Sequence, residues 1–223
     1  MQRVPEPEEL MEDAVQVAAY AAADFQESNS NFMKLFERHF GEAKISGCAL
    51  DIGCGPGDIC FRFARAYPNC QVHGLDGSEE MLAFARKTLQ QQPPILRGRV
   101  RFIHGRIPEA ALPRPRYDII LCNSLLHHLP DPAVLWQFIK KTAAENAPVL
   151  VMDLKRPPSE ADARTLVNQY AENEPEILRR DFYNSFLAAF EPEEVRSQLR
   201  SAGLANLSVE EVSDRHLLVW GWI

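Results

Sequence analysis

Three glycines at alternate positions follow a short apolar run that contains one acidic residue. The glycines are Gly53, Gly55 and Gly57, and Asp51 lies near the end of the run. Glycine lets the backbone turn with positive φ and lets a ligand approach the main chain without meeting a Cβ atom. The pattern therefore predicts a strand, a tight loop and a helix, with the amides of the loop presented to a ligand.

The spacing of these glycines bears on which ligand the loop binds. The dinucleotide fingerprint requires glycines at the first, third and sixth positions. Counted from Gly53, the sixth position is Asp58. A carboxylate at the N-terminus of the helix would repel the pyrophosphate of such a cofactor. The sequence therefore disfavours a nicotinamide or flavin dinucleotide.

A second acidic residue ends the next predicted strand. Residues 71–76 (QVHGLD) end in Asp76, which precedes Gly77, Ser78 and a new helical pattern. A carboxylate in this position can accept hydrogen bonds from both hydroxyls of a ribose. Together with ALDIGCGPG at 49–57, it resembles motif I and the ribose-binding acid of the class I S-adenosylmethionine-dependent methyltransferases. The resemblance extends over about 45–223 and implies S-adenosyl-L-methionine as the cofactor.

The resemblance also implies which residues contact that cofactor. It places the glycine loop near the methionyl part, and it gives Asp51 the role of orienting the loop or contacting the amino group. The family holds the adenine with an acid or an amide after the third strand, where this sequence has Arg106. The cofactor contacts predicted in this way are Tyr20, Asp51, Gly53, Cys54, Gly55, Gly57, Asp76, Gly77, Ser78, Met81, Gly105, Arg106, Asn123 and Ser124.

The fourth predicted strand runs into a segment with two adjacent histidines. This segment, NSLLHHLPDP at 123–132, resembles motif IV of small-molecule methyltransferases. The proline-rich tetrad of enzymes that methylate DNA or glutamine amino groups is absent, which favours a small-molecule acceptor. His128, with His127 as the alternate, is the predicted general base, because an imidazole with a pKa near ~6.5 exchanges protons at neutral pH.

Two other roles for these histidines remain open. A histidine can pack under a turn and donate to a backbone carbonyl, and histidines with carboxylates can bind a metal. Asp153 is a possible further ligand, but its spacing from the histidines is not diagnostic. The predicted site therefore contains no metal.

The segment 155–190 is longer than a simple crossover and is predicted to cover the acceptor. Ser159 begins a capping box, and Pro175 interrupts the helical pattern that follows. The predicted acceptor contacts in this segment are Arg156, Tyr183 and Asn184. The alternative is a helical hairpin that only covers the end of the sheet.

Strand and helix patterns alternate from Cys48 onward, which predicts a mostly parallel sheet with right-handed crossovers. The expected strands are 48–53, 71–76, 100–105, 117–123 and 147–153. Residues 207–212 and 216–220 form two more strands, and the short link between them requires an antiparallel pair. We therefore predict an α/β, Rossmann-like, doubly wound sheet of seven strands, mostly parallel, with an antiparallel C-terminal strand.

Apolar stripes at 8–25 and 32–40 predict two N-terminal helices with a break at 27–30. They either pack against the edge of the sheet or cap the cofactor, and in the second role Tyr20 is the residue of interest. The domain prediction is a helical cap at 1–44 and a methyltransferase domain at 45–223.

The composition limits the classes of partner. A net charge of −7 over 223 residues disfavours nucleic acid, whose binding depends on clustered Lys and Arg. No apolar run approaches ~20 residues and the N-terminus lacks the apolar core of a signal peptide, so no membrane is expected and a cytoplasmic location is predicted. Five cysteines without a CxxC pair predict reduced thiols.

The prediction is thus an enzyme that methylates a small molecule by in-line displacement, and the oligomeric state is left open. The rival prediction is a methyltransferase-like regulatory or scaffold protein that binds the cofactor without turnover.

Overall fold

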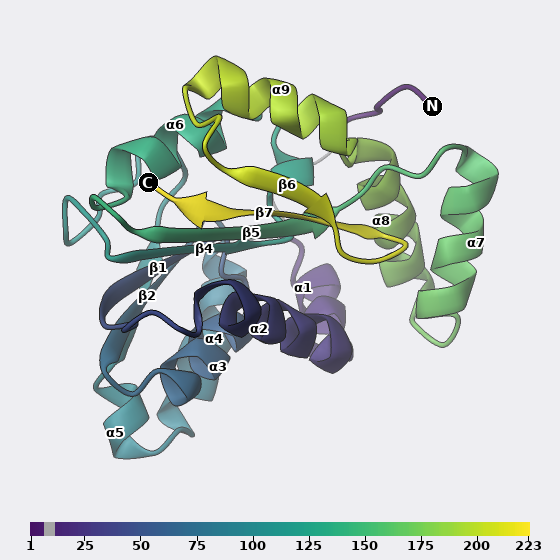
Figure 1. Ribbon diagram of the computed structural model, residues 1–223. Helices are drawn as coiled ribbons and strands as arrows, with labels where there is room; N and C mark the ends of the chain where they lie inside the picture. The colour runs from purple at the N-terminus through teal and green to yellow at the C-terminus, as the bar shows by residue number, and fades with distance from the viewer. Residues whose placement is uncertain (7–11) are drawn as a thin grey trace.

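The computed structural model describes residues 1–6 and 12–223, which form one seven-stranded sheet of order β3-β2-β1-β4-β5-β7-β6 (Figure 1). Only β7 runs antiparallel to its neighbours, β5 and β6. The predicted sheet is therefore confirmed. The strands are β1 (Gly47–Ile52), β2 (Cys70–Asp76), β3 (Val100–His104), β4 (Ile119–Asn123), β5 (Pro148–Leu154), β6 (Ser208–Glu211) and β7 (His216–Trp222).

Helices cover both faces of the sheet (Figure 1). On one face α6 and α9 pack over a core that includes Leu50, Cys122 and Val151. On the other, α2 and α3 enclose a core that includes Phe36 and Leu121. Because both faces are covered, all seven residues of β5 are buried and this strand reads as a continuous apolar run broken by one acid.

The helices are α1 (Ala14–Ala22), α2 (Gln26–Phe40), α3 (Asp58–Ala66), α4 (Glu79–Gln90), α5 (Pro94–Arg97), α6 (Ala133–Thr142), α7 (Glu160–Ala171), α8 (Glu176–Ala188) and α9 (Pro192–Ala202), with a 3₁₀ turn, η1 (Leu126–His128). Among the helices of the described residues, none is long and apolar enough to cross a membrane. All five cysteines are free and buried.

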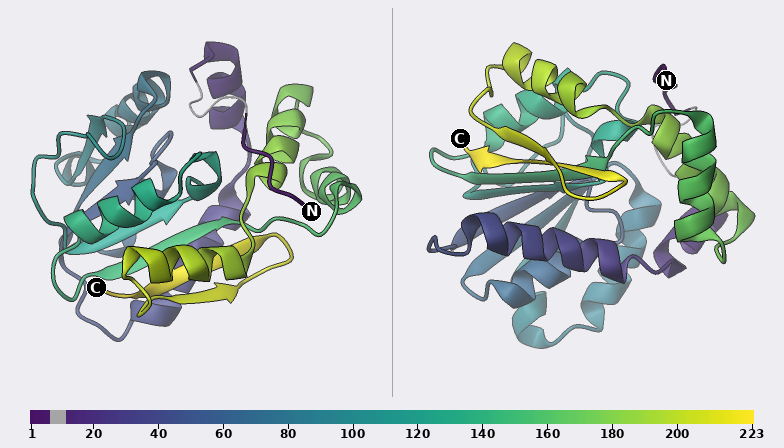
Figure 2. Two further views of the ribbon diagram at one scale, coloured as in Figure 1. Left: turned by 90° about the horizontal axis from the view of Figure 1, so that it is seen from above. Right: turned by 45° about the vertical axis from the view of Figure 1, so that its right-hand side comes forward.

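Three helices gather beyond the carboxyl ends of the parallel strands. The antiparallel pair α7 and α8 stands side by side there, and α1 contacts both α8 and α4 (Figure 2). Ser159 caps α7 as predicted, accepting a hydrogen bond from the amide of Asp162. Pro175 precedes α8, so the interruption of the 155–190 segment also lies where the sequence places it.

The N-terminal helices differ from the expectation. The described part of the first helix begins at Ala14, capped by Asp13, and Leu10 of its expected stripe lies outside the described residues. The break falls at 23–25 rather than 27–30, and α2 begins at Gln26, whose amide donates to Asp24 Oδ1. The side chain that accepts a hydrogen bond at the start of α2 is therefore Asp24, about one turn before the polar break that the sequence predicts. The boundary between 44 and 45 stays a prediction, although α2 shares its core with α3.

Candidate active site

The glycine loop is held against the end of β2 by backbone hydrogen bonds. The amides of Gly53 and Cys54 both donate to the carbonyl oxygen of Leu75, over 2.8 and 3.0 Å. The amide of Gly55 donates to Asp76 Oδ2 over 2.7 Å, and Asp76 Oδ1 accepts from the amide of Ser78 over 2.8 Å. The loop and the predicted ribose-binding acid are therefore one connected unit.

A cavity of about 420 Å³ opens beside this unit. Its wall contains ten of the fourteen predicted cofactor contacts, from α1, β1, the glycine loop, the ends of β2 and β4, and α4. They are Tyr20, Asp51, Gly53, Cys54, Gly55, Asp76, Ser78, Met81, Asn123 and Ser124. The structure thus brings most of the predicted set together around one space.

The other four predicted contacts, Gly57, Gly77, Gly105 and Arg106, do not line this cavity. Gly57 is instead the N-cap of α3, with a φ of +88° that favours glycine. The amide of Gly105 donates a hydrogen bond to the backbone carbonyl oxygen of Asp76 and so helps to fix the position of this residue. No residue after β3 therefore faces the cavity at the position expected for the adenine contact.

Asp58 is the first residue of α3 and lines the same cavity. Its Oδ2 accepts hydrogen bonds from Asn29 Nδ2 over 2.7 Å and from Arg62 Nε over 2.6 Å. The N-terminus of this helix thus presents a carboxylate where a dinucleotide-binding site would receive a pyrophosphate. The structure agrees with the argument from glycine spacing.

Asp51 is buried beneath the loop and still forms part of the cavity wall. Burial raises its pKa to about 7, and the hydrogen bond that Cys60 Sγ donates to Asp51 Oδ2 over 3.1 Å only partly opposes this shift. A carboxyl group with such a pKa gains or loses its proton near neutral pH, according to the charge that a ligand brings close to it.

Asn123, at the end of β4, has a buried polar atom whose hydrogen bonding indicates a ligand. Its Nδ2 donates to Asn29 Oδ1 over 3.2 Å, whereas its Oδ1 is buried and has no partner among the described residues. Buried carbonyl oxygens normally accept a hydrogen bond. An S-adenosylmethionine molecule, which carries an ammonium group and hydroxyl donors, fits a cavity with this acceptor and the Asp76 carboxylate.

A second cavity of about 530 Å³ lies next to the first and shares Tyr20, Asn123, Ser124 and His128 with it. Its outer wall comes from α1 and α8 and includes Gln16, Asp181 and Asn184. The Tyr20 ring packs on Phe25 at 4.6 Å between centroids, and burial raises the pKa of this tyrosine to about 12. Part of the 155–190 segment thus forms a cavity wall.

Two predicted acceptor contacts lie elsewhere. Arg156 is buried, and its Nη2 donates to Glu191 and Glu194 over 3.0 and 2.9 Å. The hydroxyl of Tyr183, on α8, donates to Glu160 Oε2 at the start of α7 over 3.0 Å, in an exposed hydrogen bond. Neither residue lines either of the two cavities, so their role in binding the acceptor stays a prediction that the geometry of the cavities does not support. The guanidinium of Arg156 turns toward the start of α9 because two carboxylates there compensate its charge.

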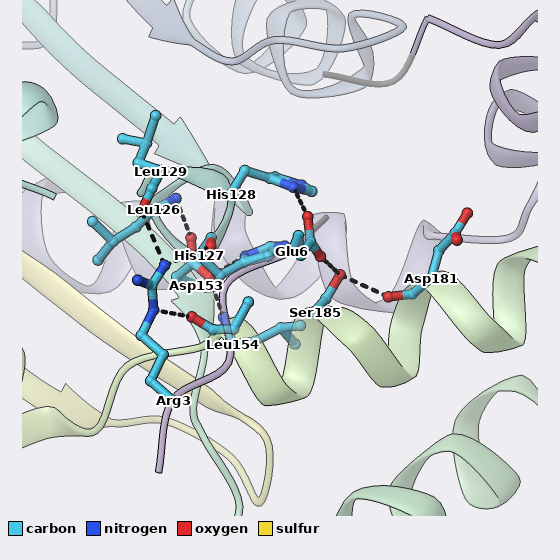
Figure 3. Close-up of polar contacts among 11 residues, drawn as sticks. Arg3, Glu6, Leu126, His127, His128, Leu129, Asp153, Leu154, Asp181 and Ser185 are labelled. Carbon is cyan, nitrogen blue, oxygen red and sulfur yellow. Dashed lines mark hydrogen bonds and ion pairs between the residues drawn. The ribbon is translucent and has the colours of Figure 1, made fainter. Parts of the chain in front are cut away.

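The adjacent histidines each hold a carboxylate through Nδ1 (Figure 3). His127 Nδ1 lies 2.6 Å from Asp153 Oδ1, and both side chains are buried. Burial lowers the pKa of His127, but the charge and the hydrogen bond of Asp153, with the charge of Glu6, together outweigh this and the net pKa is raised. His128 Nδ1 is hydrogen-bonded to Glu6 Oε2, and His128 is in the wall of both cavities.

Glu6, His127 and His128 also offer potential metal ligands within 4.8 Å of one another. Two imidazoles and a carboxylate suit several transition metals. However, the Nδ1 atoms of both rings and the Glu6 carboxylate are already hydrogen-bonded within the cluster and to Asp153. We assign no metal to this site.

Several residues of the site were missed by the sequence analysis. Glu6 and Asn29 come from the N-terminal segment and α2, and Ser185 and Asp181 come from α8. The hydrogen bonds from Asn29 to Asn123 and from Glu6 to His128 span 94 and 122 positions of sequence. The only local signal was the cluster of polar and aromatic residues around 179–186, which predicted a pocket but not its members.

The comparisons with known proteins decide the family. The protein-family profile described as a methyltransferase domain matches residues 49–145. The chain contains a class I S-adenosylmethionine-dependent methyltransferase domain. The family prediction is therefore confirmed, and the matched residues contain the glycine loop, Asp76 and both histidines.

Curated relatives of this methyltransferase domain match part of the chain. An uncharacterised methyltransferase of Schizosaccharomyces pombe is 30% identical over 95 residues, which are 41% of this chain and 34% of the relative. The chain matches 34% to 39% of the length of the first curated relatives.

Two solved structures share the fold of the methyltransferase domain. A methyltransferase of Aquifex aeolicus superimposes with a TM-score of 0.65 at 17% identity, covering 96% of this chain and 100% of that one. A phosphoethanolamine N-methyltransferase of Haemonchus contortus, solved with phosphomonomethylethanolamine and S-adenosylhomocysteine, gives 0.66 at 19% identity over 89% of this chain and 43% of its own.

Proposed function

We propose that this chain transfers a methyl group from S-adenosylmethionine to a small-molecule acceptor. The observation that carries the proposal is the meeting of two cavities at Tyr20, Asn123, Ser124 and His128. One cavity contains the glycine loop and Asp76, and the other has room for a separate molecule. A shared wall of this kind suits a transfer between two bound molecules.

The cofactor supplies a methyl group that is already activated on a sulfonium. The protein then has to hold the nucleophile within about 3–3.5 Å of the methyl carbon and in line with its bond to sulfur. Residues at the junction of the cavities are placed to do this. Where the nucleophile carries a proton, His128 is the proposed base, since it faces both cavities while His127 is buried against Asp153.

The larger cavity also suggests the character of the acceptor. Its two arginines are already paired, Arg180 with Asp181 and Arg215 with Asp214. We infer an acceptor with hydrogen-bond donors or positive charge rather than a carboxylate or a phosphate, because the acidic residues outnumber these arginines. The acidic residues in the wall are Glu6, Asp24, Glu27, Glu174 and Asp181.

The rival function is a regulatory or scaffold protein that keeps the cofactor without turnover. The 530 Å³ cavity favours the enzyme, because a scaffold has no need for open space beside the cofactor. Incubation with methyl-labelled S-adenosylmethionine and a metabolite extract tests this directly. Transfer of label to a small molecule supports the proposal. Labelling of protein or RNA alone, or of nothing, contradicts it.

A further inference from the structure

The first six residues of the chain form hydrogen bonds with the elements around the candidate active site. The amide of Val4 donates to the carbonyl oxygen of Leu187 over 2.9 Å. Arg3 Nε donates to the carbonyl oxygen of Ala188 over 2.6 Å, and its Nη2 donates to those of His127 and Leu129 over 3.1 and 2.9 Å. Arg3 thus joins the end of α8 to the η1 turn (Figure 3).

These hydrogen bonds hold the N-terminal segment so that the Glu6 side chain lies next to His128. The Glu6 Oε2 atom bonds to His128 Nδ1, and Glu6 Oε1 accepts from Ser185 Oγ over 2.6 Å (Figure 3). The Glu6 side chain is only 8% exposed. Both of its oxygens are therefore engaged by groups from α8 and η1.

The charge of Glu6 fixes which nitrogen of His128 carries a proton. Burial raises the pKa of Glu6, but the hydrogen bond and charge of His128 outweigh it and lower that pKa to about 2. An ionised carboxylate is an acceptor only. His128 Nδ1 must therefore donate, so in the neutral ring Nε2 is the proton acceptor.

The two histidine and carboxylate pairs differ in what they face. The His127 side chain is 3% exposed and its partner Asp153 1%. The His128 side chain is 27% exposed and borders both cavities. His127 lines the larger cavity alone, where it is almost fully buried, whereas His128 borders both cavities and is the more exposed of the two rings.

We propose that Glu6 is a positioning residue that holds His128 as the Nδ1–H tautomer, so that Nε2 accepts the proton of the methyl acceptor. This inference rests on the proposed function. The acceptor's heteroatom gives its proton to Nε2 and uses the electron pair of that bond to form the bond to the methyl carbon. The electrons of the bond between carbon and sulfur remain on sulfur. The positive charge lost from the sulfonium then lies on the imidazolium, beside the Glu6 carboxylate, until the proton leaves to solvent.

The test reads the histidine tautomer and needs no acceptor. Protein labelled with ¹⁵N-histidine is examined by long-range ¹H–¹⁵N NMR at a pH where His128 is neutral, and His128→Ala assigns the signal. We expect an unprotonated Nε2 and a protonated Nδ1 in the wild type. In Glu6→Ala the population should shift toward the Nε2–H form, whereas Glu12→Ala, which removes an exposed carboxylate of the same segment, should leave it unchanged.

Retained binding of S-adenosylmethionine shows that Glu6→Ala is folded, since Glu6 does not line the cofactor cavity. Once an acceptor is known, Glu6→Ala should lower kcat and change its pH profile, with little further loss when His128→Ala is added. A wild-type His128 with Nε2 protonated, or one whose signals move when EDTA is added, overturns the proposal. Because the tautomer is read without cofactor, a failure of the proposed function is seen separately, as absent cofactor binding.

Discussion

The amide of Gly55 donates a 2.7 Å hydrogen bond to Oδ2 of Asp76, which ties the glycine loop to the acid at the end of β2. Gly55 itself lines the cofactor cavity, and a Cβ atom added to it would meet nothing within 4 Å. A Cβ atom added to Gly57 would lie 2.6 Å from Phe102 Cζ. The two glycines therefore serve different purposes.

Gly57→Ala should destabilise the fold, and Gly55→Ala should mainly weaken cofactor binding. Both positions have positive φ, which costs a residue with a Cβ about 1–2 kcal/mol, but only Gly57 adds a clash. The methyl group of Gly55→Ala enters the cavity instead, and we expect at least about a tenfold loss of affinity, or ~1.4 kcal/mol. Chemical denaturation and calorimetry measure the two effects. If both variants lost the same free energy of unfolding and bound the cofactor with the same affinity, the two glycines would not have different roles.

Cofactor binding should be accompanied by the release of a proton from the Asp51 carboxyl group. Its pKa is raised from 3.8 to about 7 by burial, so the folded protein holds this proton more tightly than the unfolded chain does. The contribution of Asp51 to the free energy of unfolding is therefore greatest below pH 3.8 and is lost as the pH rises through about 7. A bound ammonium group favours the ionised form, so binding near pH 7 should release roughly half a proton.

Calorimetry in buffers of different ionisation enthalpy measures that release. Asp51→Asn should bind without it and should lose the corresponding slope of stability against pH. If the wild type shows no dependence on the buffer, Asp51 does not sense the cofactor.

Arg156→Ala should lower stability without changing the affinity for the acceptor. The arginine is 4% exposed, and its two glutamates are 46% and 42% exposed, so we expect a loss of about 2–3 kcal/mol, less than for a fully buried pair. Arg164→Ala, which breaks an exposed pair on α7, should cost less than about 1 kcal/mol. Denaturation curves test both variants. An unchanged midpoint for Arg156→Ala together with a raised KM would restore its role in binding the acceptor.

His128→Ala and His127→Ala should fail in different ways. Loss of a general base lowers kcat by about 10²–10⁴, and we expect this for His128→Ala with cofactor affinity preserved. His127→Ala leaves the buried Asp153 carboxylate with backbone amide donors but without its imidazole partner, and should destabilise the fold by about 3–5 kcal/mol. Turnover at pH 6 and pH 8 and thermal unfolding separate the two outcomes. Full activity in both variants would leave only positioning as the source of catalysis.

The sequence predicted the cofactor side of the site better than the acceptor side, for a physical reason. The glycine loop and Asp76 lie at the ends of adjacent parallel strands, where short segments set the geometry. Glu6 reaches His128 across 122 positions, and no local pattern reveals such a contact. Arg156 follows β5 directly, yet the carboxylates of α9 decide where its side chain turns.

The most direct measurement is a calorimetric titration of S-adenosylmethionine into the wild type and Asp76→Ala. The account predicts one-to-one binding by the wild type. Asp76→Ala should bind at least about tenfold more weakly, because each hydrogen bond to a charged group is worth ~1.5–3 kcal/mol and the Gly55 amide also loses its acceptor. Glu80→Ala, which removes an exposed carboxylate from α4, the helix that follows Asp76 in the chain, should bind as the wild type does. No binding by the wild type, or equal affinity in Asp76→Ala, would contradict the account.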